Sequence, residues 1–163
     1  MKISEAIKFR RSIRQYGGKP VSDDTVTRII EAGIWAPSGM NNQPWKFRVL
    51  KGAEKDALAD FTKYGAIIKN APVAVAVFLD NGAVYNREKD IMAVGACVQN
   101  MLLEAHSLGL GTCWLGEIVN KKKEVAARLG TERDAELMAV IMLGYPDEEV
   151  TESCRKPLKD FLI

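Results

Sequence analysis

The sequence predicts an α+β fold in which several helices pack on a small sheet. Segments whose apolar residues follow helical spacing come first, and mixed strand-like and helical segments follow them. Two of the strand-like segments, residues 73–79 and 137–143, are unbroken apolar runs, as expected for strands covered on both faces. A length of 163 residues is typical of a single domain, so residues 1–163 are expected to share one core.

The N-terminal part of the chain is predicted to hold two helices. Residues 3–9 place their apolar side chains mainly on one side of a short helix. A second helix begins after Ser22, a suitable N-cap, and ends before Pro37. The apolar stripe of this second helix consists of Val26, Ile29, Ile30, Gly33 and Ile34.

The middle of the chain is predicted to contain a strand, a helix and then the longest helix of the protein. Residues 45–50 alternate as a half-buried strand does, and residues 53–61 have a helical pattern. Residues 85–108 form a helical pattern that is apolar around its whole circumference. Because such a helix must be buried on every side, we expect it at the centre of the fold and partly at a subunit interface.

The C-terminal part is predicted to alternate between strand and helix. The glycine-rich residues 109–111 end the long helix, and residues 112–115 form a short strand. Asn120 is expected to cap a helix that runs to Leu129. The mostly polar tail ends in three apolar residues at 161–163, which we expect to pack against another surface.

Charge and composition exclude several classes of protein. The net charge of +2 argues against a dedicated nucleic-acid binder and against a polybasic membrane protein. No apolar run reaches the ~18 residues of a membrane span. Three cysteines, Cys97, Cys113 and Cys154, form no C-x-x-C pair, and no apolar signal segment is visible, so a reduced cytoplasmic setting is predicted.

His106 is the only histidine, which limits both metal binding and acid–base chemistry. A zinc site would have to draw it and all three cysteines from distant positions, so no metal site is predicted. Cys97 and Cys113 are instead expected to be small buried apolar residues. His106 is expected near a helix C-terminus, where positive charge is favoured. Ser-His-Asp or Cys-His catalysis without His106 is excluded.

The best candidate for an anion site is the segment that follows the first helix. Arg10, Arg11 and Arg14 lie together there with Ser12, and arginine is suited to bidentate binding of phosphate or carboxylate. The alternative is a set of solvated cations at a helix C-terminus. The pair at 155–156 is a second, weaker candidate. Neither of the common glycine-rich phosphate-binding motifs is present.

In order and spacing, four segments of the chain resemble the flavin-dependent nitroreductase family, over nearly the whole sequence. Residues 10–14 (RRSIR) resemble its R-R-S-x-R motif, and residues 36–45 (APSGMNNQPW) resemble A-P-S-x-x-N-x-Q-P-W. The helical region that leads into GLGTCWLG at 109–116 and the RKPL at 155–158 are also similar to the family. The resemblance implies a three-layer α/β/α sandwich with a mixed, mostly antiparallel sheet, in a domain-intertwined homodimer.

By this resemblance the protein binds FMN at the interface of an obligate homodimer, and each flavin is held by both chains. The residues implied for the phosphate, the ribityl chain and the pyrimidine edge are Arg10, Arg11, Ser12, Arg14, Arg155 and Lys156. The residues implied to approach the flavin ring from the partner chain are Pro37, Ser38, Gly39, Met40 and Asn41. The backbone near Leu115 and Gly116 is implied to lie close to the flavin N5 atom.

The implied reaction is a ping-pong oxidoreduction. NADH or NADPH delivers a hydride to the flavin N5 atom and leaves, and a nitroaromatic compound, a quinone or a similar small acceptor is then reduced. No catalytic side chain is expected, because the chemistry is that of the cofactor. Two alternatives remain, an FMN-binding storage or sensor protein and a flavin-free anion-binding module. Met40 and the short loop at 80–85 leave open whether the site is open or covered by the Met40 side chain.

Overall fold

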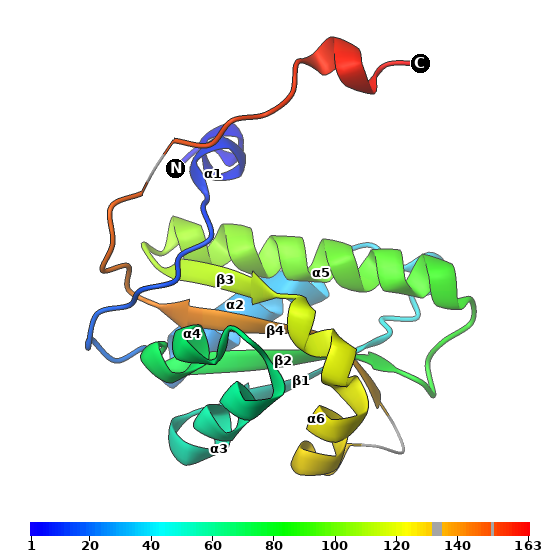
Figure 1. The fold of residues 1–163 in the computed structure, drawn as a ribbon. Helices are drawn as coiled ribbons and strands as arrows, with labels where there is room; N and C mark the ends of the chain where they lie inside the picture. Colours follow the sequence, from blue (N-terminus) through cyan, green and yellow to red (C-terminus); the bar gives the residue numbers. More distant parts are fainter. Residues whose placement is uncertain (132–134, 151) are drawn as a thin grey trace.

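The computed structural model describes residues 1–131, 135–150 and 152–163, which are arranged in three layers (Figure 1). The middle layer is a sheet of β1 (Trp45–Leu50), β2 (Val73–Asp80), β3 (Gly111–Leu115) and β4 (Ala135–Gly144). One face is covered by α2 (Asp23–Ile34) and α5 (Arg87–Ser107), and the other by α3 (Gly52–Asp56), α4 (Gly65–Asn70) and α6 (Lys122–Leu129). The predicted α/β/α sandwich is therefore confirmed.

The strands follow the order β1-β2-β4-β3, and all three neighbouring pairs are antiparallel. Parallel pairing occurs in the described chain at one bridge, between Ser12 and Thr112 at the free edge of β3. There the backbone N–H of Ile13 donates to the carbonyl of Thr112 at 2.8 Å. The sheet is thus mostly antiparallel, as expected, and the segment after the first helix is fixed along its edge.

The core lies on both sides of β2 and β4. Alternate residues of β2, including Val75 and Val77, pack toward α2 and α5, while Ala76 and Phe78 pack toward the opposite helices. Every residue from Val73 to Leu79 is buried or nearly so. This confirms the prediction that an unbroken apolar run marks a strand covered on both faces.

The two helices on one face pack closely because of a glycine. A Cβ atom at Gly33 of α2 would lie 2.7 Å from the Cγ atom of Met101 on α5, so a side chain there would separate the helices. The predicted N-cap of α2 is confirmed, since the Ser22 hydroxyl accepts from the N–H of Thr25 at 3.2 Å. The Asn86 side chain caps α5 in the same way, through the N–H of Lys89 at 3.1 Å.

Within this chain α5 is not covered on all sides. Its inner residues are buried, but Met92 is 67% exposed and Ala96 and Leu103 are only half-buried. An uncovered apolar strip is what the predicted subunit interface requires, and the interface itself stays a prediction. None of the helices in the described ranges has both the length and the apolar content that crossing a membrane would require.

Three details of the helical layer formed by α3, α4 and α6 differ from the sequence-based expectation. The predicted helix at 53–61 is divided into α3 and the 3-10 helix η2 (Ala57–Phe61), and α4 was not predicted. Gly65 at the start of α4 lies so close to η2 that a Cβ atom would be 2.6 Å from the carbonyl oxygen of Ala59. The predicted cap at Asn120 is wrong, because Asn120 lies inside the 3-10 helix η3 (Glu117–Lys121) and α6 begins at Lys122.

Both ends of the chain lie on the α5 side of the sheet (Figure 1). The tail, with the short helix η4 (Leu158–Phe161), extends away from the body, and Leu158 and Phe161 are 73% and 63% exposed. The apolar residues Ile3 and Phe9 of α1 (Ile3–Phe9) are exposed as well. The surface predicted to cover the tail is therefore not provided by the described part of the same chain.

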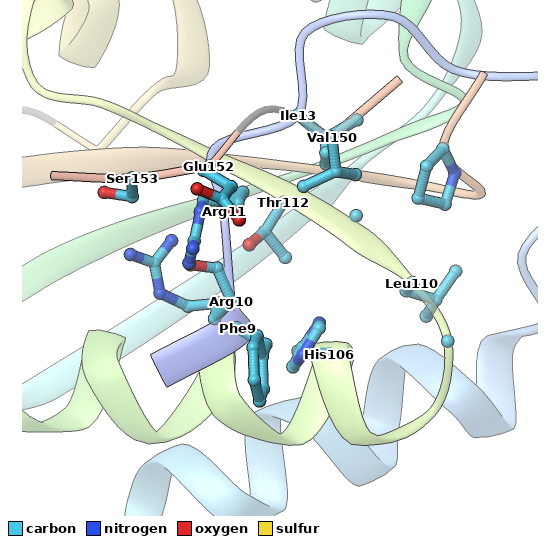
Figure 2. A pocket seen from close by; sticks show the side chains of 13 residues that line it. Phe9, Arg10, Arg11, Ile13, His106, Leu110, Thr112, Val150, Glu152 and Ser153 are labelled. Carbon is cyan, nitrogen blue, oxygen red and sulfur yellow. The ribbon is translucent and has the colours of Figure 1, made fainter. Parts of the chain in front are cut away.

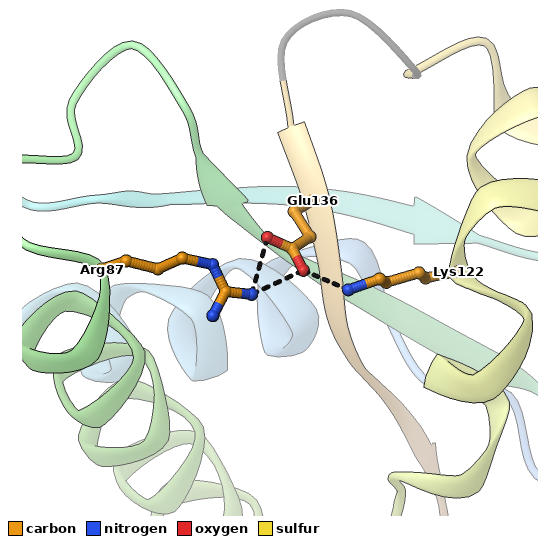
Figure 3. Close-up of polar contacts among 3 residues, drawn as sticks. All are labelled: Arg87, Lys122 and Glu136. Carbon is orange, nitrogen blue, oxygen red and sulfur yellow. Dashed lines mark hydrogen bonds and ion pairs between the residues drawn. The ribbon is translucent and has the colours of Figure 1, made fainter.

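An ion cluster joins the two helical layers at one end of the sheet (Figure 3). The carboxylate of Glu136 on β4 accepts from Arg87 of α5 at 2.8 and 3.0 Å and pairs with Lys122 of α6. The hydrogen bonds from Lys122 and then Arg87 outweigh partial burial and lower the pKa of Glu136. The cluster thus ties α5 and α6 to the same strand from opposite faces.

Candidate functional site

The segment of residues 10–14 continues directly from α1 and runs beside the edge strand β3. Arg10 is the C-cap of α1, and its backbone N–H donates to the carbonyl of Ala6. The contact with β3 is close, because a Cβ atom at Gly111 would lie 2.7 Å from the Cβ atom of Ile13. Glycine at position 111 therefore allows the segment to approach, and the flanking side chains of residues 10–12 and 14 are presented at the sheet edge.

Arg10, Arg11, Arg14 and Arg155 form what we call the arginine cluster. Burial and the nearby charges of Arg11 and Arg155 lower the pKa of Arg10. In the described part of the chain the Arg10 guanidinium has no hydrogen bond or ion pair, and that of Arg14 contacts only the carbonyl of Ser12, at 3.3 Å. Arg155 donates to the Ser153 hydroxyl and to the Cys154 carbonyl. Among the described residues, Arg10 and Arg14 thus lie among like charges without a carboxylate ion pair, an arrangement that favours anion binding.

A cavity of about 600 Å³ lies beside the cluster (Figure 2). Its lining combines the end of α1, the end of α5, β3 and the start of the tail, and includes Phe9, Arg10, Arg11, His106, Leu110, Thr112 and Val150. A second cavity of about 420 Å³ continues past Arg11, Ser12 and Arg14. The Thr112 hydroxyl is buried and has no hydrogen-bond partner among the described residues. Buried hydroxyls normally have a partner, so this one is available to a ligand or to water.

A third cavity, of about 270 Å³, lies at the end of β3. It is lined by Leu115 and Gly116, as well as by Arg14, Tyr64 and Trp114. Arg14 thus belongs to both the second and the third cavity and connects the arginine cluster with the residues predicted to lie near a flavin N5 atom. Tyr64 was not predicted as a site residue, because the helix that it precedes was not predicted.

The other group of predicted site residues is the loop around η1 (Gly39–Asn41). Pro37, Ser38 and Gly39 line a cavity of about 270 Å³ together with residues of α5, whereas Met40 is 79% exposed. Met40, Asn41 and Gln43 have φ values of 53°, 55° and 47°, which are unusual for residues other than glycine. The loop is therefore strained and must be held by its surroundings.

A buried carboxylate holds this loop. Asp90 in the first turn of α5 accepts from the Asn42 side chain at 2.8 Å and from the N–H groups of Tyr85 and Asn86 at 3.0 Å each. Burial alone would raise the pKa of Asp90, but these hydrogen bonds and the charge of Lys89 lower it. Asp90 is thus an ionised anchor that joins the loop to α5, a role that was not predicted from the sequence.

In one chain the two groups of predicted residues lie apart along α5. The loop cavity is lined by Ala96 and the arginine-side cavity by His106, and ten residues of helix at about 1.5 Å each separate them by about 15 Å. The structure therefore brings the arginine cluster together with Ser12, Leu115 and Gly116, but not with residues 37–41. Lys156 is exposed in the tail.

His106 and the cysteines differ in how far they match expectation. His106 lies in the last turn of α5, as predicted. Burial and the charges of Arg10 and Arg11 lower its pKa and therefore oppose the positive charge expected at this helix end. Cys97 and Cys113 are buried, as predicted. Burial raises the pKa of Cys97 to about 12. Burial also raises the pKa of Cys113, so neither thiol is readily ionised.

Comparison with known proteins decides the family. The model of the nitroreductase family matches residues 7–65 and 60–145. The chain belongs to the nitroreductase family. A Desulfovibrio desulfuricans protein described as a nitroreductase, solved in complex with FMN, is 46% identical, with a TM-score of 0.96 over 100% of this chain and 96% of that one.

Curated relatives agree with this family assignment. A Methanothermobacter thermautotrophicus protein named as an NADH dehydrogenase/NAD(P)H nitroreductase is 34% identical over 151 residues, which cover 91% of this chain and 79% of the relative. The NADPH-flavin oxidoreductase of Vibrio harveyi is 28% identical over 166 residues, which cover 94% and 69%. The resemblance inferred from the motifs is confirmed, and this nitroreductase-family protein is an oxidoreductase by family.

Proposed function

We propose that the protein is an FMN-dependent NAD(P)H oxidoreductase that reduces nitroaromatic compounds, quinones or similar small acceptors, with residues 1–163 acting as one FMN-binding domain. The observation that carries this proposal is the arginine cluster, in which the partly buried Arg10 is crowded by Arg11 and Arg155 and has no carboxylate partner in the described chain. A phosphate monoester carries a charge of about −1.5 to −2 and would relieve this crowding.

The surroundings of the cluster also suit FMN. The cavity at the end of β3 offers apolar walls for a ring, through Trp114 and Leu115 among others, and the cavity beside Arg10 offers an unpartnered hydroxyl at Thr112. We assign the phosphate to Arg10, Arg11, Arg155 and Lys156, the ribityl chain and pyrimidine edge to Ser12 and Arg14, and the ring edge near N5 to the backbone at Leu115 and Gly116. Except for that of Lys156, these assignments are supported by the common position of the residues at the edge of β3 or at the start of the tail.

The second half of each site is proposed to come from a second copy of the chain. Residues Pro37, Ser38, Gly39, Met40 and Asn41 lie about 15 Å along α5 from the arginine side, too far to close over a ring held there by the same chain. The exposed apolar side chains on α1, α5 and the tail supply the surface that a dimer would bury. An obligate homodimer with two shared sites accounts for both observations.

When bound, FMN supplies the redox chemistry, transferring a hydride between NADH or NADPH and the acceptor. The chain's own residues bind the phosphate, orient the ring and exclude water from it. We assign no catalytic side chain, because this division of work needs no acid or base from the protein.

An absorbance spectrum of the purified protein tests the proposal. We expect a band near 450 nm that is bleached anaerobically by NADH or NADPH and returns when a nitroaromatic compound or a quinone is added. A yellow protein that neither nucleotide bleaches would support the storage or sensor alternative. A colourless protein whose melting temperature FMN does not raise would support the anion-binding alternative.

The Arg14→Ala variant tests the assignment of residues. Loss of one charge-assisted hydrogen bond should weaken FMN binding by about 1.5–3 kcal/mol and leave the fold of the cofactor-free protein intact. Arg128→Ala is the matched control, because Arg128 is an exposed residue of α6 in the opposite helical layer. Equal FMN affinity in the two variants would refute the role of Arg14.

A further inference from the structure

The arginine-side cavity contains an imidazole, that of His106, to which the proposed function assigns no role. His106 reaches this cavity from the last turn of α5, opposite the segment that carries Arg10 and Arg11 (Figure 2). It is close enough to both arginines for their charges to act on it. It is also the only histidine of the chain.

A second, independent observation points to a ligand in the same cavity. Thr112 is 1% exposed, and its hydroxyl has no hydrogen-bond partner among the described residues. Figure 2 shows this hydroxyl on the side of the cavity where Arg10 and Arg11 lie. A buried hydroxyl without a hydrogen-bond partner has a free-energy cost, so a ligand that accepts a hydrogen bond from it would bind more tightly.

The charges around His106 favour its neutral form in the free protein. Arg10 and Arg11 face it from the segment after α1, and Glu152 is the acidic residue that the tail contributes to the cavity lining. Arg155 lies close enough to Arg10 for its positive charge to lower the pKa of Arg10. Together with burial, the arginines lower the pKa of His106 in the free protein.

We propose that His106 and Thr112 complete the phosphate subsite of FMN, and that His106 takes up one proton from solvent when the phosphate binds. The inference rests on the proposed function. The bound phosphate offsets the positive charge of Arg10 and Arg11, so the imidazolium form becomes favourable and its N–H donates to a phosphate oxygen. The Thr112 hydroxyl donates to the same group. FMN affinity therefore depends on pH through His106.

Nuclear magnetic resonance can follow His106 directly, because an untagged protein gives a single histidine signal. With ¹³C-labelled protein and unlabelled flavin, the titration is recorded free, with FMN, and with riboflavin, which lacks the phosphate. We expect FMN to raise the pKa of His106 by about one unit or more and riboflavin to leave it nearly unchanged. An unchanged value with FMN, or an equal rise with riboflavin, would overturn the inference.

Two variants separate the contributions to affinity. The dissociation constant of FMN is measured at pH 6 and at pH 9 for the wild type, His106→Gln and Thr112→Val. We expect His106→Gln to weaken binding about tenfold more at pH 6 than at pH 9, and Thr112→Val to weaken it roughly three- to tenfold at both. The titration of the phosphate of free FMN near pH 6 is common to the three proteins and cancels in the ratio.

The outcomes distinguish this inference from the function on which it rests. A wild-type protein that binds no FMN would overturn both. A wild-type protein that binds FMN, with a His106→Gln effect that is equal at the two pH values, would overturn only the proton uptake. An unaltered FMN affinity in Thr112→Val would overturn the assignment of that hydroxyl.

Discussion

Replacing Asp90 should destabilise the protein strongly, although the residue lies outside the arginine cluster. The carboxylate is fully buried and accepts three hydrogen bonds, one from Asn42 and two from backbone N–H groups. Asp90→Ala leaves three donors without their acceptor, which we expect to cost about 3–5 kcal/mol of unfolding free energy. Asp90→Asn keeps the shape but not the charge, and should cost about 1.5–3 kcal/mol.

Urea unfolding of the cofactor-free protein at a fixed protomer concentration measures these costs. The folded-state pKa of Asp90 is lowered. The stabilisation by its carboxylate is therefore complete at pH values above the unfolded pKa of about 3.9, and it is lost as the pH falls through the folded-state pKa. The difference between the wild type and Asp90→Asn should therefore shrink below about pH 4. Asp60→Ala at an exposed position is the control, with an expected change within about 0.5 kcal/mol. A loss below about 1 kcal/mol in Asp90→Ala would refute the anchoring role.

Two further changes test contacts that shape the fold around the site. Gly111→Ala forces a Cβ atom against Ile13, so it should lower the free energy of unfolding in urea by about 1–3 kcal/mol and weaken FMN binding. The control Gly18→Ala, which has open space around it, should be nearly neutral. Equal stability of the two variants would contradict the close approach of Gly111 to Ile13. Glu136→Gln should lower the melting temperature at pH 7. The folded-state pKa of Glu136 is lowered, so the carboxylate stabilises the protein at pH values above its unfolded pKa of about 4.3, and this stabilisation is lost as the pH falls through the folded-state pKa. A melting-temperature difference that is the same at pH 7 and pH 3 would argue against the ion pair with Lys122.

The elements that the sequence predicted well are those whose signal is local. The apolar run at 73–79 corresponds to β2, which ends one residue later, and the Ser22 cap begins α2 as expected. The short helix α4 was missed because six residues that begin with glycine carry little periodicity, and its position depends on the contact between Gly65 and Ala59. Asn120 is a good cap by composition, but η3 continues through it into α6.

The candidate site was predictable where its residues are contiguous and not where they meet across the fold. The arginines at 10–14 and the loop at 37–41 are visible as motifs, and both lie next to cavities. Asp90 supports the loop from 48 positions beyond Asn42, and only its place in the first turn of a long helix could have drawn attention to it. Thr112 and His106 gain interest only once β3, α1 and α5 are brought together around one cavity.

The central pair of strands has a consequence for how the protein folds. β2 and β4 pair from Val73 with Leu143 to Asp80 with Ala135, so their pairing closes loops of roughly 55 to 70 residues, with all of α5 in between. Contacts so distant in sequence slow folding, and we expect the sheet to form on a scale of milliseconds to seconds, after local contacts such as those of α5. The deepest strands should thus pair late in folding, and their separation amounts to global unfolding. The rate at which these strands separate, rather than the rate at which the looser chain ends open, would then determine how long the native protein survives heating.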